Sequence, residues 1–87
     1  MYRVRLTEKT KKELKKLDQH TSKLILAWIR KNLEGTEDPR QHGKALTTNK
    51  SGQWRYRIGE YRLLAEIKDN ELIIHVITIS HRKNIYR

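Results

Sequence analysis

The sequence predicts an α+β fold: a small antiparallel β-sheet with an N-terminal helical hairpin packed on it, in the order β-α-α-β-β-β. Polar and apolar residues alternate along 53–58 and 61–68, which is typical of half-buried strands. Two-residue links at 59–60 and 69–70 are typical of tight turns between antiparallel strands. Large apolar side chains recur at helical spacing before these strands. With 87 residues, the chain has room for a single domain, 1–87, and one core.

The N-terminal third is predicted to hold one short strand and two helices. Residues 2–6 alternate with period two, and Thr7 is placed to cap a Lys-rich helix of about ten residues. Residues 18–21 (DQHT) offer a break and a new cap for the next helix. This second helix carries apolar side chains at i, i+4 spacing along 24–33 and ends at Gly35. The link between the helices is short, so they are expected to form a hairpin.

The rest of the chain is predicted to be one long loop and three strands. Residues 36–52 contain Gly, Pro, Asn and Ser at many positions and are expected to form the loop. The last strand, 71–80, has apolar residues at both parities, so we expect it inside the sheet. The predicted core residues are Leu6, Leu14, Leu17, Leu24, Trp28, Ile29, Leu63, Ala65, Ile67, Val76 and Ile77.

The composition narrows the class of protein. Twenty Lys and Arg residues against ten Asp and Glu give a formal net charge of +10, which favours a polyanionic partner such as nucleic acid. The absence of Cys excludes disulfides, thiolate zinc sites and a cysteine nucleophile. The longest apolar runs, 24–29 and 72–74, are far shorter than the ~20 residues of a membrane span. We therefore expect a soluble, cytoplasmic protein with no signal peptide, membrane partner, metal or cofactor.

Arginine side chains gather on one predicted hairpin. Alternation along 53–58 places Arg55 and Arg57 on one face, and the apolar side chains, Tyr56 among them, on the other. Arg62 begins the next strand, so the hairpin brings three guanidinium groups together. Like charges at cross-strand distance repel one another unless an anion is bound, so the patch predicts an anion site. The alternative is an ordinary solvated sheet face.

The C-terminal tail is a second cluster of polar side chains. His81, Arg82 and Lys83 follow the last strand, and Tyr86 and Arg87 come shortly after them. Side chains leave the sheet at such a position and become available to a substrate. The alternative is a frayed basic tail.

The four histidines have different expected environments. His20 lies in the turn between the helices and His42 in the long loop, so both are expected to be surface residues. His75 lies inside the last strand and is expected to be half-buried. Only His81 combines the end of a strand with a neighbouring arginine. It is the candidate for proton transfer, because imidazole gains and loses a proton near neutral pH.

These side chains suit the cleavage of RNA by its own 2′-hydroxyl. The reaction needs no metal and no protein nucleophile. It needs a base for the 2′-hydroxyl, an acid for the leaving 5′-oxygen and positive charge for the phosphorane. Arginine stays charged and stabilises such an anion well. DNA has no 2′-hydroxyl and cannot be cleaved in this way.

Three blocks of the sequence resemble the RelE branch of the RelE/ParE toxin superfamily. They read DPRQHGKAL at 38–46, GQWRYRIGEYR at 52–62 and HRKNIY at 81–86, in the order of the family. The resemblance implies the same fold, a toxin of a type II toxin–antitoxin system, and endoribonuclease cleavage of mRNA in the ribosomal A site, which inhibits translation. It also implies three partners: an acidic antitoxin, the ribosome with its mRNA, and operator DNA reached through the toxin–antitoxin complex.

The resemblance further implies which residues act. Where the best-known members have Lys on the strand after the loop, this chain has Arg, which favours His81 as the proton-transfer group. The catalytic positions implied by the resemblance are Arg55, Arg57, Arg62, His81, Arg82 and Tyr86. The residues expected to bind RNA or the ribosome are Lys44, Arg55, Arg57, Lys83 and Arg87.

Two other functions remain open. The ParE branch has the same fold but inhibits DNA gyrase by binding and has no nuclease activity. A nucleic-acid-binding module without activity is the third possibility.

Overall fold

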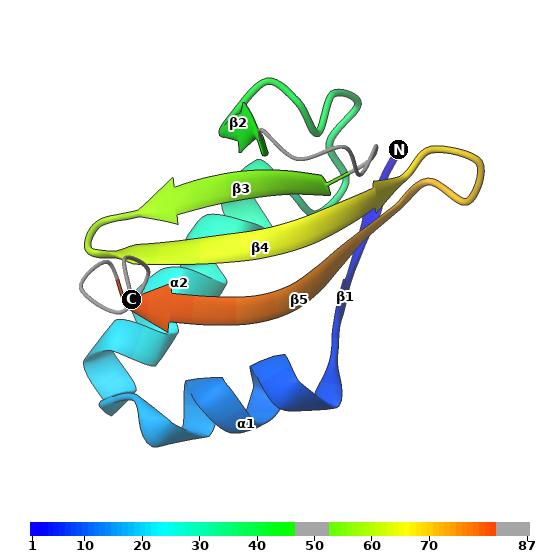
Figure 1. Ribbon diagram of the computed structural model, residues 1–87. Helices are drawn as coiled ribbons and strands as arrows, with labels where there is room; N and C mark the ends of the chain where they lie inside the picture. The colour runs from blue at the N-terminus through cyan, green and yellow to red at the C-terminus, as the bar shows by residue number, and fades with distance from the viewer. Residues whose placement is uncertain (47–52, 82–87) are drawn as a thin grey trace.

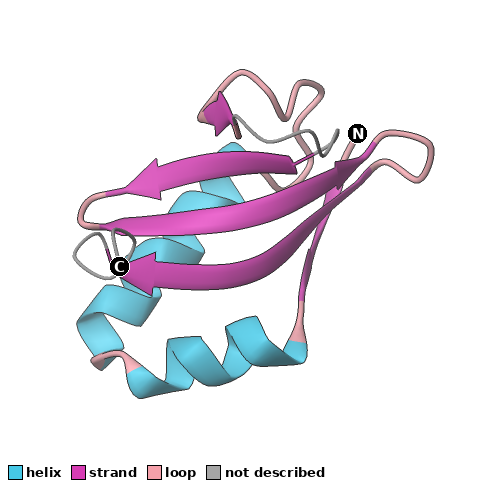
Figure 2. Ribbon diagram, in the orientation of Figure 1, coloured by secondary structure: helices cyan, strands magenta, loops and turns pink. Residues whose placement is uncertain are grey.

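Two helices and five strands make up the part of the chain that the computed structural model describes, residues 1–46 and 53–81 (Figure 1). In chain order the elements are β1 (Arg3–Leu6), α1 (Glu8–Lys16), α2 (Gln19–Asn32), β2 (Lys44–Ala45), β3 (Gln53–Ile58), β4 (Tyr61–Lys68) and β5 (Ile73–His81). The strands form one sheet, α2 lies against one face of it, and α1 runs beside β5 (Figure 2). The predicted α+β class is confirmed. No helix in the described part is long and apolar enough to span a membrane.

Both helices begin at a residue that caps them: Thr7, as predicted, and Asp18, which lies within the segment 18–21 predicted to hold the second cap. The Thr7 hydroxyl accepts a hydrogen bond from the Thr10 amide at 3.1 Å, and the Asp18 carboxylate accepts one from the Thr21 amide at 3.0 Å. Each cap pairs an amide that the start of a helix would leave unpaired. The hydrogen bonds from the Thr21 hydroxyl and amide hold the pKa of Asp18 below its ordinary value. The charged carboxylate is therefore favoured at the positive end of α2.

The sheet is mixed, with the strand order β1-β5-β4-β3-β2. β3, β4 and β5 form the predicted antiparallel meander. β1 pairs with β5 in parallel, so the expectation of a wholly antiparallel sheet is wrong at this edge. A tight turn forces consecutive strands to run in opposite directions, but β1 and β5 are separated by the helices and the meander. The short strand β2, where a loop was expected, pairs with β3 at the other edge.

The hydrophobic core lies between the helices and one face of the sheet. Its buried residues are Tyr2, Leu14, Ile25, Ile29, Leu33, Tyr56, Leu63, Ala65, Ile67, Ile74, Val76 and Ile79. Six of the predicted core residues are confirmed by this set: Leu14, Ile29, Leu63, Ala65, Ile67 and Val76. Three more are partly buried and pack against it: Leu6, Leu17 and Trp28.

The prediction that Leu24 belongs to the core is wrong. Leu24 is 54% exposed, whereas Ile25 is 1% exposed and Ile29 is 5% exposed. Neighbouring residues on a helix are rotated by about 100° from each other, so one helix cannot turn both Leu24 and Ile25 to the sheet. Leu33, which is fully buried, continues the stripe of Ile25 and Ile29. The structure selects this stripe over the one that contains Leu24 and Trp28.

The prediction that Ile77 is buried is also wrong, because a β-bulge lies there. Leu64 on β4 pairs with Thr78, and Ala65 pairs with Val76, so the register passes over Ile77. A bulge adds one residue to one strand and shifts the alternation of side chains beyond it. Val76 and Ile79 therefore both face the core, and Ile77 is half-buried.

The neighbouring pair Ile25 and Leu24 offers a test of the position of α2. We expect Ile25→Ala to lower the free energy of unfolding by about 2–5 kcal/mol, because it leaves a cavity in a closed core. Leu24→Ala should change it by less than about 0.5 kcal/mol, because its side chain is largely in water. Urea denaturation of both variants measures the difference, and equal effects would contradict the assigned face of α2.

Candidate active site

Four basic side chains that the sequence singled out line one pocket of about 470 Å³. They are Lys44 of β2, Arg55 and Arg57 of β3, and Arg62 of β4. The remaining lining residues are Trp28, His42 and Gly43. The predicted convergence of the three arginines is confirmed. Lys44, which was expected to bind RNA, lies in the same pocket.

Strand pairing explains why these cations meet. Arg57 lies opposite Arg62 across the β3–β4 hairpin, and Lys44 lies opposite Arg55 across the β2–β3 pair. Directly opposed like charges destabilise a sheet. None of the described residues that line the pocket is acidic. The pocket therefore concentrates positive potential that a phosphate group would balance.

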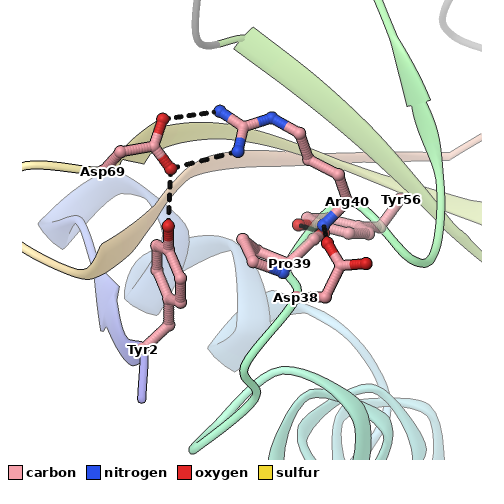
Figure 3. A network of polar contacts seen from close by, with 6 residues as sticks. All are labelled: Tyr2, Asp38, Pro39, Arg40, Tyr56 and Asp69. Atoms are coloured by element: carbon pink, nitrogen blue, oxygen red, sulfur yellow. Dashed lines mark hydrogen bonds and ion pairs between the residues drawn. The ribbon is translucent and has the colours of Figure 1, made fainter.

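The loop before β2 is fixed from the side of the β4–β5 turn (Figure 3). The Arg40 guanidinium donates to both carboxylate oxygens of Asp69, at 3.0 and 2.9 Å. The Tyr2 hydroxyl donates to the same carboxylate at 2.6 Å. The hydrogen bonds from Arg40 and Tyr2 lower the pKa of Asp69 from 3.8 to about 2. Three distant parts of the chain are thus joined at one carboxylate.

The same loop is fixed from the side of β3. The hydroxyl of Tyr56, which is completely buried, donates to the Pro39 carbonyl at 2.6 Å, and the Trp54 indole donates to the His42 carbonyl at 2.6 Å. Burial raises the pKa of Tyr56 well above its ordinary value, so the phenol remains a donor. Gly43 has φ +81°, and a Cβ there would collide with the Arg55 carbonyl and with Trp54. Only glycine fits this position without strain.

These contacts bring His42 into the pocket. Its side chain is half-buried, and its ring lies 5.6 Å from the ring of Trp28 with an interplanar angle of 68°. The expectation of a plain surface residue is wrong here, because the loop folds back on β3 and α2. Gly43, next to His42, was the one local feature of the sequence that indicated a close approach between this loop and another part of the backbone. A loop has no hydrophobic periodicity from which the position of His42 could be predicted.

His81, the predicted proton-transfer residue, lies at the end of β5. It pairs with Tyr61, and the two rings meet edge to face at 5.0 Å. Arg62 pairs with Ser80, the residue before His81. Because side chains alternate between the two faces along a strand, Arg62 and His81 point to opposite faces of the sheet. His81 does not line the arginine pocket. The other predicted tail residues, Arg82, Lys83, Tyr86 and Arg87, lie outside the described residues.

An apolar groove of about 320 Å³ opens beside α2. Leu24 and Trp28 line it from the helix, and Ile58 and Tyr61 line it from the β3–β4 hairpin. Leu24 is the most exposed of the large apolar side chains on α2, and it stands at this groove. The groove therefore explains why α2 has two apolar stripes, one toward the core and one toward the surface.

Known proteins are similar in sequence to almost the whole chain. Residues 4–86 match the family described as "ParE toxin of type II toxin-antitoxin system, parDE". The chain is 30% identical over 86 residues to Toxin RelG of Mycobacterium tuberculosis. The aligned region covers 99% of this chain and 97% of that protein.

Solved structures with the same fold include two toxins. The toxin–antitoxin complex RelBE2 from Mycobacterium tuberculosis matches with a TM-score of 0.81 at 28% identity, over 95% of this chain and 93% of that chain. The isolated RelE toxin of E. coli matches with a TM-score of 0.75 at 20% identity, over 93% of this chain and 84% of that chain. At 20% identity, the match to E. coli RelE shows a common fold and nothing further.

The low pKa of Asp69 gives a pH test of the loop anchor. A carboxylate with a lowered pKa stabilises the folded state above its ordinary pKa of 3.8, and this contribution is lost as the pH falls through about 2. We expect Asp69→Asn to lower Tm at pH 7, and the difference from the wild type to close between about pH 4 and pH 2. Glu71→Gln, a control in the same turn, should show a smaller difference. A Tm difference for Asp69→Asn that does not change with pH would contradict the ionic anchor.

Proposed function

This chain belongs to the RelE/ParE superfamily and is a toxin of a type II toxin–antitoxin system, and from that premise we propose that it is a ribosome-dependent endoribonuclease. It cleaves mRNA in the ribosomal A site and thereby stops translation. The observation that carries this proposal is the pocket of Lys44, Arg55, Arg57 and Arg62. Its size and charge suit a phosphodiester group of RNA.

The chemistry follows from what the side chains in the pocket can do. Arginine cannot act as a base at neutral pH, so Arg55, Arg57 and Arg62 serve as charge stabilisers for the phosphorane. The substrate supplies the nucleophile, its own 2′-hydroxyl, so the reaction proceeds without a metal or a cofactor. His81 is assigned the proton transfer from this hydroxyl because of the resemblance of the block HRKNIY to RelE-type toxins and because histidine is the residue type that exchanges a proton near neutral pH.

The tail completes the site in this proposal. Arg82 adds positive charge to the phosphorane, Tyr86 contacts the substrate, and Lys83 and Arg87 bind RNA or the ribosome. These roles rest on the resemblance of the block HRKNIY to RelE-type toxins and on the net charge of +10.

The partner of a type II toxin is its antitoxin, and RelBE2 of Mycobacterium tuberculosis was solved as such a complex. We propose that the antitoxin of this chain is an acidic protein that covers the arginine pocket or displaces the tail. Its apolar side chains have the groove of Leu24, Trp28 and Tyr61 as a place to bind. The complex reaches operator DNA through the antitoxin, and the toxin acts in the cytoplasm, where the ribosomes are.

A ParE-like function is the second candidate, because the family matched over residues 4–86 is described by the name ParE. A ParE-like toxin inhibits DNA gyrase by binding and needs no phosphorane-stabilising pocket. The four cations that line one pocket favour the nuclease, since guanidinium and ammonium groups suit a phosphodiester as their ligand.

Pulsed expression in cells separates the two functions. We expect expression of this chain alone to arrest growth and to create new mRNA 5′ ends inside translated codons, because the ribosome presents the substrate. Co-expression of the acidic antitoxin should restore growth, and gyrase supercoiling should be unchanged. Growth arrest with intact mRNA and inhibited supercoiling would establish the ParE-like function instead.

Single substitutions test the assigned roles. His81→Gln should bind ribosomes normally but cleave about two to four decades more slowly, which is the usual contribution of a positioned acid or base. Arg62→Ala should cost a comparable factor, because it removes charge that stabilises the phosphorane. Cleavage kinetics on translating ribosomes measure both variants, with Lys11→Gln on the outer face of α1 as the control. Unchanged cleavage by His81→Gln would remove His81 from the mechanism.

A further inference from the structure

A second pocket, the sheet pocket, adjoins the arginine pocket. It has a volume of about 200 Å³, and Arg55 and Arg62 line both pockets. Its other lining residues are Leu46, Leu63, Leu64, Thr78 and Ser80. None of the described residues that line it is acidic. The sheet pocket thus combines leucine side chains with two of the cations that are proposed to bind phosphate.

Leu64 brings an apolar side chain to the sheet face that carries the arginines. Its neighbour Leu63 is completely buried in the core, so alternation directs Leu64 to the opposite face of β4. There it lies between Arg55 on β3 and Thr78 on β5, which both pair with it. Leu64 is half-buried and lies outside the core cluster, so its side chain is available to a ligand on this face.

Leu46 and Thr78 add to the apolar character of the sheet pocket. Leu46 follows β2 directly and is half-buried. The Thr78 hydroxyl donates to the carboxylate of Glu13 on α1, whose two oxygens lie 3.0 and 2.8 Å away. The proton of this hydroxyl is therefore engaged by α1 and is not offered to a ligand in the pocket.

The volume of the sheet pocket suits one heterocyclic ring system. A cavity of about 150 Å³ lined by apolar side chains binds a benzene ring. The sheet pocket, with about 200 Å³, is somewhat larger. Proteins recognise single-stranded RNA through bases that leave the stack and pack against apolar or aromatic side chains and against the planes of arginine guanidinium groups. Leucines and arginines around one small pocket match this kind of ligand.

The shared arginines indicate that both pockets serve one ligand. A nucleotide joins a phosphate group to a base through a single sugar, so a bound phosphate carries a base close beside it. Arg55 and Arg62 have the arginine pocket on one side and the sheet pocket on the other. A nucleotide with its phosphate among the cations can therefore place its base against Leu64.

We propose that the sheet pocket binds one nucleobase of the mRNA, from a nucleotide next to the phosphate in the arginine pocket. Leu46 and Leu64 pack against the base, and Arg55 and Arg62 contact both the base and the phosphate. Binding of the base orients the nucleotide relative to the arginines before cleavage. This inference rests on the proposed endoribonuclease function and adds a base-binding subsite to it.

Removal of the base tests the contact directly. The cleaved linkage is first mapped with the wild-type chain on a ribosome-bound mRNA. The nucleotides on either side of this linkage are then replaced, one at a time, by an abasic ribonucleotide, which keeps its 2′-hydroxyl. The kcat/KM of wild type, Leu64→Ser and Leu46→Ser is measured with the intact and the abasic mRNAs. Leu72→Ser, in the β4–β5 turn and outside both pockets, is the matched control.

We expect removal of the base at one of the two positions to lower the kcat/KM of the wild type by about five- to 150-fold, the range that one stacked base contributes. Leu64→Ser and Leu46→Ser should each lose at least about fivefold with the intact mRNA. With the abasic mRNA of that position they should be within about twofold of the wild type, because the partner of the leucines is already gone. Leu72→Ser should match the wild type throughout.

Three results would overturn the inference. Equal losses with intact and abasic mRNA at both positions would show that the leucines support the structure and touch no base. Normal cleavage by both variants, combined with weaker growth rescue by the co-expressed antitoxin, would show that the sheet pocket binds the antitoxin. Both of these results leave the proposed function standing. A wild-type chain that cuts no mRNA would overturn the proposed function, and the base-binding subsite with it.

Discussion

The arrangement of the site depends on one buried hydrogen bond, from the Tyr56 hydroxyl to the Pro39 carbonyl. Tyr56 is completely buried, and a buried phenol without a partner costs about 1–3 kcal/mol. Residues 38–46, folded back over β3, supply this partner through the Pro39 carbonyl and so avoid that cost. Arg55 and Arg57 flank Tyr56 in β3 and point to the opposite face of the strand. The hydrogen bond from Tyr56 to Pro39 therefore also holds the loop whose residues line the pocket with these arginines.

A second anchor at Asp69 makes this arrangement rigid. Arg40 and Tyr2 share one carboxylate, so the loop, the β4–β5 turn and the N-terminal strand are held in a single network (Figure 3). None of these three residues lines the arginine pocket. The network fixes the loop through Arg40, two residues before His42, whereas the cations of the pocket lie on β2, β3 and β4. The network thus helps to hold the loop that carries Lys44 against the strands that carry the arginines.

The fold alone does not choose between the activities of the superfamily, because toxins with different targets share it. The choice depends on side chains that project from this fold. In this chain they include the cations of β2, β3 and β4 that line one pocket. Such a cluster of cations suits the negative charge that develops on a phosphorane, which an endoribonuclease has to stabilise.

Local patterns in the sequence were sufficient for the cap at Thr7, a second cap within 18–21, the meander and the convergence of the three arginines on the β3–β4 hairpin. Neighbouring residues determine caps, alternation and tight turns. They could not choose which apolar stripe of α2 meets the sheet, since Leu24 and Ile25 are both suited to a core. The bulge at Ile77 and the parallel pairing of β1 arise from contacts between residues far apart in the chain. The position of His42 also depends on such contacts. Its loop has no hydrophobic periodicity, and it is held by hydrogen bonds with Tyr56, Trp54 and Asp69 that form only in the folded protein.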